Sequence, residues 1–348
     1  MPYIVKYSLK RIGLLLVTTF IILTITFFLV KMLPNAAMPT NEAQLLAYCQ
    51  DQAGLGNYVL SFAEDPSLGT LAKSITTDDS ITYYFYYAPL VKQYGNWLVG
   101  IFTRWDWGVS TAVDAGKSAM LIIGERLKPT ILINVFTIII AIPLGFIFGI
   151  VAALHKNQPI DNFISTVVMI FISVPSFVTI SLLMLWLCYD NQWLPSSWPV
   201  NGTPAQYASA MVVPVLALTF GTVAAFTRYT RAELCEVMSS EFLLLARTKG
   251  LSRSQCIVRH ALRNSMVPIV PMIIGQFIGI LGGSIILEQL YGINGIGQLF
   301  IQCINYKDYN VLLVDMAVFT VIDLVANLLV DLSYGIVDPR IRMGAKNA

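Results

Sequence analysis

Long stretches of apolar residues alternate with short polar segments along this chain, and the pattern predicts several membrane-spanning helices. A helix needs about 20 predominantly apolar residues to cross the hydrocarbon core of a bilayer. The first uncharged run of that length lies between Arg11 and Lys31. The sequence predicts six helices in all, within residues 12–30, 129–154, 162–189, the second half of 191–227, 264–287 and 311–335.

The overall composition agrees with this pattern. Apolar residues make up 56% of the 348 residues and charged residues only 12%, whereas a soluble domain carries roughly a quarter charged residues. The formal net charge of +2 is too small to indicate a nucleic-acid partner. We therefore expect an all-α membrane protein that sits in a lipid bilayer and binds no nucleic acid.

The distribution of lysine and arginine predicts the orientation, because cytoplasmic loops are enriched in both. With both termini in the cytoplasm, fourteen of the 22 basic residues fall on the inner side, and the two short outer loops hold only Lys307. We therefore expect both termini to be cytoplasmic. The basic start of the chain also resembles a signal peptide, but the apolar run of 12–30 is longer than such peptides use, which favours a retained helix.

The segment between the first two predicted helices is long and rich in aromatic residues. It contains ITYYFYYAPL at 81–90, followed by Trp97, Trp105 and Trp107. Two interpretations stay open: a small folded cap that a soluble partner contacts, or aromatic packing at the membrane interface. The predicted organisation is an N-terminal tail and first helix (1–33), an external segment (34–125), a five-helix core (126–340) containing a cytoplasmic loop (228–264), and a cytoplasmic tail (341–348).

Motifs for catalysis and nucleotide binding are absent from the sequence. Gly116-Lys117-Ser118 resembles the end of a phosphate-binding loop, but Thr111 occupies the position of the required glycine. Both histidines, His155 and His260, fall in predicted cytoplasmic loops, so no Ser–His pair is expected at membrane depth. The H-E-x-x-H pattern of metalloproteases is absent as well. We expect no catalytic residue and no cofactor in this chain.

The five cysteines do not show the spacing of a metal site. Cys49 and Cys303 both fall on the predicted outer side, and a disulfide between them is one interpretation. A role as small apolar residues is the favoured interpretation. We expect no metal site.

The cytoplasmic loop has the signals of two short helices separated by a glycine. Ser239-Ser240-Glu241 predicts a helix start with a serine cap. Arg247 and Lys249 favour the end of this helix, and Gly250 favours its termination. Ser252 is placed to cap a second helix.

Three interpretations of this loop compete. Binding to anionic lipid accounts for the basic residues, and a solvated charged surface accounts for them as well. Neither explains the apolar stretch Phe242–Leu245 or the glycine turn. Docking of a short helix into a groove on a cytoplasmic partner explains both features and is favoured.

Residues 227–268, TRYTRAELCEVMSSEFLLLARTKGLSRSQCIVRHALRNSMVP, resemble the cytoplasmic coupling loop of ABC-importer permeases. The similarity is to the oligopeptide/dipeptide/nickel family, and within it to the B-type subunit. It continues through RLKPTILINVFTIIIAIPLGFIFGIVAAL (126–154), LGGSIILEQLYGINGIGQL (281–299) and NLLVDLSYGIVDPRIR (327–342). The chain departs from the general importer pattern in three places. Leu244-Leu245-Ala246 replaces Glu-Ala-Ala, and His260 and Arg263 replace Ile and Pro.

The resemblance implies a type I ABC importer permease fold with six membrane-spanning helices and an enlarged external segment. It also implies a heterodimer with a second, related permease, two ATPase subunits that hold ATP and Mg²⁺, an external solute-binding protein, and a peptide substrate. Nickel or another small solute is the nearest alternative cargo, and an ATP-independent secondary transporter is a less favoured class. The residues implied in ATPase coupling are Glu241, Leu244, Leu245, Ala246, Arg247, Lys249, Gly250, Arg259, His260 and Arg263.

Three aspartates on the last predicted helix are candidates for a polar role in the membrane. Asp315, Asp323 and Asp331 are spaced by eight residues, which does not align them on one helix face. Asp331, near the inner end, is expected to pair with a basic residue of the loops, and Asp315 is expected to be hydrated near the outer interface. Asp323 is expected at mid-membrane. It contacts either a cationic group of the substrate, such as a peptide amino terminus, or a polar group on a neighbouring helix.

Overall fold

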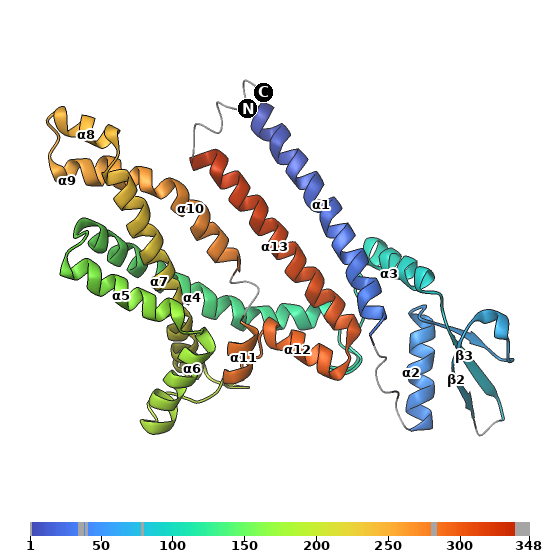
Figure 1. Ribbon diagram of the computed structural model, residues 1–348. Coiled ribbons are helices and arrows are strands. Elements are labelled where there is room, and N and C mark those ends of the chain that lie inside the picture. Colours follow the sequence, from blue (N-terminus) through green and yellow to red (C-terminus); the bar gives the residue numbers. More distant parts are fainter. Residues whose placement is uncertain (1, 34–37, 39–40, 78–79, 280–283, 338–348) are drawn as a thin grey trace. The chain divides into compact units, whose positions relative to one another are not determined.

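The computed structural model of the chain (Figure 1) describes residues 2–33, 38, 41–77, 80–279 and 284–337. The chain forms two compact units. The first unit comprises the described parts of 1–19, 124–301 and 318–348, and the second comprises those of 20–123 and 302–317. The predicted tail 341–348 lies outside the described residues.

Four helices in the described part of the chain are long and apolar enough to cross a membrane. They are α1 (Pro2–Lys31), α4 (Ala119–Leu154), α7 (Pro204–Met238) and α13 (Tyr309–Val337). Each contains one of the predicted apolar runs. The predicted helix at 264–287 corresponds to α10 (Leu262–Gly279), and its residues 280–283 lie outside the described residues. The prediction of a mostly helical chain with several spanning helices is confirmed.

The third predicted helix, 162–189, is broken in the structure. It consists of α5 (Pro159–Ser173) and of α6 (Ser176–Leu183) with its π-helical extension η2 (Met184–Asp190), and the two parts are bent by 97°. Pro175 provides no N–H donor and disfavours helical geometry in the residue before it. Val174 accordingly has an extended conformation, with φ −91° and ψ 118°. With this break counted as one bent span, the described residues hold up to five spans.

Two glycines allow α4 and α7 to pack closely in the first unit. A Cβ atom added at Gly145 would lie 2.5 Å from Cβ of Phe226, and one added at Gly149 would lie 2.5 Å from Cβ of Thr230. Both separations are too short for any side chain. Small residues four positions apart therefore set the distance between these two helices, as is common in membrane helix pairs.

The segment between α1 and α4 is folded and contains a small antiparallel sheet, which the sequence analysis did not anticipate. The strands are β1 (Tyr58–Ser61), β2 (Leu71–Thr76) and β3 (Thr82–Tyr87), in the order β1-β3-β2. The other elements of the segment are α2 (Glu42–Gly54), the 3₁₀ turn η1 (Pro66–Leu68) and α3 (Leu90–Arg104). The sheet and α2 share a buried core of Leu45, Cys49, Tyr58, Ile75 and Phe85. The aromatic stretch 81–90 therefore supplies the central strand of a folded cap.

The two cysteines on the predicted outer side do not form a disulfide. Cys49 and Cys303 are both buried, and neither takes part in a disulfide. Cys49 is completely buried in the core between α2 and the sheet. Their interpretation as small apolar residues is confirmed.

Candidate functional site

The first short helix of the predicted coupling loop is α8 (Glu241–Thr248), which follows α7 directly. Ser240 takes the extended N-cap conformation, with φ −75° and ψ 148°. Its hydroxyl donates to the carbonyl of Val237 (2.5 Å) and makes no side-chain cap, so the predicted serine cap is wrong in this detail. The carboxylate of Glu241 in the first turn favours the helix through its interaction with the helix dipole.

The turn after α8 has the predicted form. Gly250 adopts a left-handed conformation with φ +87°, which a residue with a Cβ rarely adopts. Ser252 then forms a capping box with Gln255, in which each side chain bonds the other residue's backbone N–H. The second helix runs through α9 (Arg253–Gln255) and the π-helical η3 (Cys256–Ala261) into α10. The prediction of helix, glycine turn and helix is confirmed.

One face of α8 is anchored to the rest of the first unit. Leu243 and Ala246 are only 3% and 9% exposed. They pack in an apolar cluster with Ala153 at the end of α4, Leu234 of α7, and Cys256 and Ala261 of η3. Ala246, which the resemblance places among the coupling residues, is therefore part of this anchor. A helix fixed on three neighbouring elements moves with them as one body.

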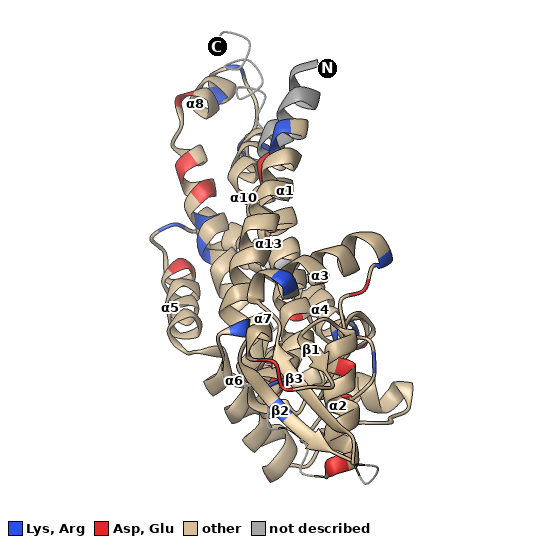
Figure 2. Ribbon diagram, turned by 90° about the vertical axis from the view of Figure 1, so that its right-hand side faces the viewer, with Lys and Arg blue, Asp and Glu red and all other residues tan. Residues whose placement is uncertain are grey.

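The opposite face of α8 is apolar and exposed. Phe242, Leu244 and Leu245 are 42%, 64% and 57% exposed. Glu241 stands at the start of α8 and Arg247 in its last turn (Figure 2). Contiguous exposed apolar residues rimmed by charges are typical of a protein interaction site. This geometry favours the partner-docking interpretation over binding to lipid headgroups.

The other coupling candidates flank this face. Lys249 is exposed at the C-cap of α8. Arg259 and Arg263 are exposed on the second helix, and His260 is half-buried between them. These basic residues therefore follow the exposed face of α8 in the sequence. They belong to the same loop, which the resemblance assigns to coupling.

A buried ion pair connects α5 to α7 and was not expected from the sequence. Arg231 donates through Nε to Asp161 Oδ1 (2.5 Å) and through a terminal nitrogen to Asp161 Oδ2 (2.7 Å). The backbone N–H of Asn157 also donates to Oδ2, at 2.9 Å. Asp161 is 1% exposed. Two parallel bonds fix orientation as well as distance, so this pair holds the start of α5 on α7.

A second buried carboxylate, Glu288, lies between α4 and the α11–α12 turn. It belongs to α11 (Ile285–Tyr291), and α12 (Ile296–Tyr306) follows. Glu288 accepts bonds from the Thr130 hydroxyl (2.8 Å) and from the Gln298 backbone N–H (2.9 Å). Burial raises the pKa of the Glu288 carboxyl, and these hydrogen bonds oppose the rise. A Cβ at Gly295 would lie 2.4 Å from the Glu288 carboxyl carbon, so the carboxylate fits only against glycine.

The three aspartates of α13 have three different surroundings. Asp331 lies 2.9 Å from Arg11, so its basic partner belongs to α1 rather than to a loop. Asp315 is completely buried, and the prediction that it is hydrated is wrong. Asp323 is exposed on the surface of this chain, and its Oδ2 accepts a bond from Asn327 (3.3 Å), one turn along the same helix.

Comparisons with known proteins agree with this architecture. Residues 145–343 match the family described as "Binding-protein-dependent transport system inner membrane component". The "Dipeptide transport system permease protein DppB" of Lactococcus lactis subsp. cremoris (strain MG1363) is 33% identical over 340 residues, which cover 97% of this chain and 100% of that protein. The "Oligopeptide transport system permease protein OppB" of Haemophilus influenzae is 30% identical over 338 residues, which cover 97% of this chain and 99% of that protein.

A solved structure shows the same fold. It is described as the inward-facing MetNI methionine ABC transporter, and the chain superposes on it with a TM-score of 0.50 at 17% identity. The match covers 63% of this chain and 97% of that chain. At this identity the likeness concerns the fold alone, and it confirms the predicted permease fold.

Proposed function

The chain belongs to the family of binding-protein-dependent transport system inner membrane components, and from this premise we propose that it is a permease subunit of an ATP-driven importer of peptides. The relatives named as dipeptide and oligopeptide transport permeases support peptides as the cargo. In this function the chain forms half of the transport pathway and performs no catalysis itself. ATP and Mg²⁺ are held by separate ATPase subunits.

The exposed apolar face of α8 is the observation that carries this proposal. Leu244 and Leu245 are held outward by a helix whose other face is fixed in the protein. Burial of an exposed leucine side chain in an interface contributes about 1.5–3 kcal/mol to the free energy of binding. The face therefore suits an apolar groove on an ATPase subunit, and acidic residues at the rim of that groove would complement the charges of Arg247 and Lys249.

The anchor of α8 supplies a route for mechanical coupling. A displacement of α8 by the ATPase is passed through Leu243 and Ala246 to the ends of α4 and α7. The Asp161–Arg231 pair then passes the motion of α7 to α5. Closure of two ATPases on ATP, one under each permease, would in this way rock the membrane helices between inward-facing and outward-facing states.

The assembly that fits this function has four further subunits. They are a second, related permease that forms a heterodimer with this chain, two ATPases, and a solute-binding protein. The excess of lysine and arginine on the α8 side of the predicted topology supports an orientation with both termini in the cytoplasm. In that orientation the solute-binding protein meets the segment between α1 and α4, on the other side of the membrane.

Within the pathway we assign a role to Asp323. Its side chain is exposed on the surface of this chain, and we place the second permease or the pathway against it. Asn327 donates to Asp323 Oδ2 and leaves the other carboxylate oxygen for a further donor. A carboxylate at membrane depth needs such a donor, since an unpaired charge there is costly. The protonated amino terminus of a peptide supplies it.

Reconstitution tests the proposed function directly. The chain is purified with its partner permease and ATPases, placed in proteoliposomes with the solute-binding protein, and assayed for uptake of a radiolabelled dipeptide. Uptake that requires ATP and stops with a non-hydrolysable analogue supports the proposal. Uptake that proceeds equally well without ATPases would show that the chain is an ATP-independent carrier.

A further inference from the structure

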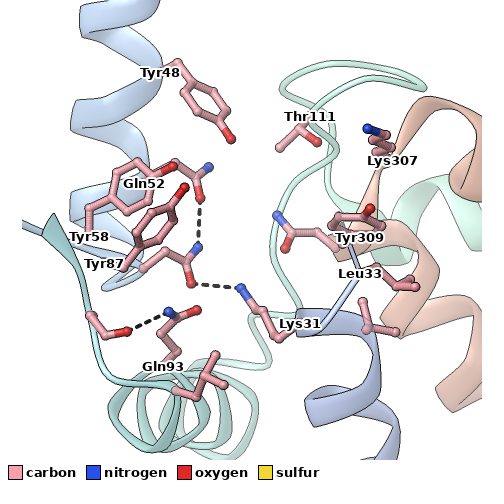
Figure 3. A pocket seen from close by; sticks show the side chains of 15 residues that line it. Lys31, Leu33, Tyr48, Gln52, Tyr58, Tyr87, Gln93, Thr111, Lys307 and Tyr309 are labelled. Carbon is pink, nitrogen blue, oxygen red and sulfur yellow. Dashed lines mark hydrogen bonds between the residues drawn. The ribbon is translucent and has the colours of Figure 1, made fainter. Parts of the chain in front are cut away.

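The second unit contains a cavity of about 330 Å³ that the coupling function does not use. It lies between α2, the strand β3, the C-terminal end of α1 and the turn before α13 (Figure 3). In Figure 3, Tyr48, Tyr58 and Tyr87 line one side, while Thr111, Lys307 and Tyr309 line the other. A volume near 300 Å³ is at the lower end of the range for small-molecule sites, and it is enough for a molecule of dipeptide size.

The charge of this cavity is positive. Two lysines, Lys31 and Lys307, line it, and none of the described residues around it is an aspartate or glutamate. The hydrogen-bond acceptor of Lys31 is a neutral oxygen, Asn57 Oδ1, at 3.1 Å. Because an ammonium group has three donors, the Lys31 side chain retains donors for an anionic ligand.

The polar side chains around Lys31 are held in place. Asn57 donates through Nδ2 to Gln52 Oε1 (2.9 Å), which turns its own oxygen towards Lys31. Gln93 donates to the carbonyl of Ala88 (2.8 Å) on the neighbouring wall. These two bonds are drawn in Figure 3. A site whose polar groups are already oriented loses less entropy when a ligand binds.

The opposite wall is fixed by a buried carboxylate next to Lys307. Asp308 is completely buried, and its Oδ2 accepts bonds from the Ser110 hydroxyl (2.5 Å) and from the backbone N–H groups of Thr111 (3.1 Å), Ala112 (3.0 Å) and Val113 (3.0 Å). This cluster attaches the loop that carries Thr111 to the turn that carries Lys307. The Thr111 hydroxyl also donates to Asp308 Oδ1 (3.4 Å), so both carboxylate oxygens are occupied within this cluster. Asp308 does not line the cavity.

We propose that this cavity is a binding site for the carboxylate of a small solute, and specifically for the carboxyl terminus of a free dipeptide. Lys31 and Lys307 bind the carboxylate, and the aromatic rings of the tyrosines contact the apolar side chains of the ligand. The dipeptide, as the class of ligand, rests on the proposed function, whereas the recognition of a carboxylate rests on the cavity alone. Because Lys31 ends the first membrane-spanning helix, the site lies at the outer membrane surface in the proposed orientation.

Calorimetric titration of the full-length chain in lipid nanodiscs tests this inference without ATP or partner subunits. The ligands are the dipeptide Ala-Phe and its C-terminal amide, which keeps the shape and lacks the negative charge. We expect saturable binding of Ala-Phe and binding of the amide that is weaker by about tenfold or more. Equal affinity for both ligands, or no binding of Ala-Phe, would overturn the proposal.

Three lysine variants locate the site. Lys31→Met and Lys307→Met remove the charge and keep an unbranched apolar chain, and each is expected to weaken Ala-Phe binding about tenfold. Lys73→Met is the matched control, since Lys73 is exposed on β2 and does not line the cavity, and its affinity should equal that of the wild type. Unchanged affinity for Ala-Phe in the Lys31→Met/Lys307→Met double variant would contradict the assignment. Competition gives a second test: inorganic phosphate that displaces Ala-Phe at the same concentration as a free dipeptide does would also contradict it.

The outcomes separate this inference from the proposed function. Carboxylate-dependent binding by a chain that shows no ATP-dependent uptake would refute the importer function and keep the site. ATP-dependent uptake by an assembly whose permease binds no Ala-Phe would refute the site and keep the importer function. Binding of an acidic solute-binding protein alone, without affinity for the free dipeptide, would assign the cavity to a protein contact and also refute the site.

Discussion

Arg231 of α7 and Asp161 of α5 form a bidentate ion pair in which the carboxylate is only 1% exposed. The Arg231 side chain is 30% exposed, whereas the Asp161 side chain is enclosed by the protein. The pair joins the helix that leads into α8 to the first half of the bent third span. It is therefore a structural link between the proposed coupling loop and the membrane helices.

Removal of the charge at Asp161 should weaken this link. Loss of one partner of a buried ion pair costs about 3–5 kcal/mol, and we expect about 2 kcal/mol for Asp161→Asn because Arg231 is partly exposed. The variant should unfold at a lower temperature in detergent than the wild type. Asp190→Asn, at an exposed aspartate of the same unit, is the control. Equal melting temperatures for both variants would show that the pair does not stabilise the fold.

Gly250→Ala tests the conformation of the turn between α8 and α9. A Cβ at Gly250 meets no atom within 4 Å, so its effect comes only from the left-handed φ of +87°. We expect a cost of about 1–2 kcal/mol and a weaker stimulation of ATP hydrolysis by transported peptide. Gly221→Ala is a matched control, because its Cβ also meets open space, but on the helix α7 with ordinary φ. If both variants behave alike, the turn has no special backbone requirement.

The contact of Gly295 with Glu288 predicts a larger effect. A Cβ at residue 295 would lie 2.4 Å from the Glu288 carboxyl carbon and 2.5 Å from the Thr130 hydroxyl. Gly295→Ala should therefore destabilise the chain by about 1–3 kcal/mol through overpacking, measured as a lower melting temperature. Gly124→Ala, whose Cβ meets nothing within 4 Å, is the control and should leave the melting temperature unchanged. A normal melting temperature for Gly295→Ala would rule out the close packing of this turn on α4.

The role assigned to Asp323 predicts an effect that depends on the chemistry of the peptide. Asp323→Asn should reduce ATP-dependent uptake of peptides with a free amino terminus about tenfold. Uptake of the same peptides after N-acetylation, which removes the positive charge, should change little between variant and wild type. Competition assays in proteoliposomes measure both quantities. Unchanged uptake and an unchanged range of substrates in the variant would remove Asp323 from the pathway.

Features that depend on a single stretch of sequence were predictable. Apolar runs give the spanning helices because a bilayer requires a fixed helix length, and α1, α4, α7 and α13 contain the predicted runs. The glycine turn at Gly250 followed from helix stop signals. The bend of 97° at Pro175 was not predicted, because it depends on how the two parts of the span pack.

Features that depend on distant residues were not predictable. Asp161 and Arg231 are 70 positions apart, and nothing in either local sequence indicates the other. Glu288 directly follows the predicted fifth helix. The sequence signal for its buried site was the pair of glycines at 295 and 297, because a backbone that approaches a carboxylate closely needs glycine. The aromatic stretch 81–90 is compatible with a membrane interface as well as with a strand, so the sheet could not be predicted from this stretch alone.

The central claim, that the exposed face of α8 seats in an ATPase subunit, is tested most directly by native mass spectrometry of complexes purified through a tagged permease chain. The test variant is Leu244→Ser/Leu245→Ser, and the control is Leu71→Ser, at an exposed leucine of the other unit. Removal of two leucines from an interface should cost about 3 kcal/mol or more, which corresponds to at least a hundredfold weaker binding. The account predicts two ATPases on the wild type and on the control, and at most one on the double variant, because the ATPase under this chain is lost. Retention of both ATPases by the double variant would contradict it.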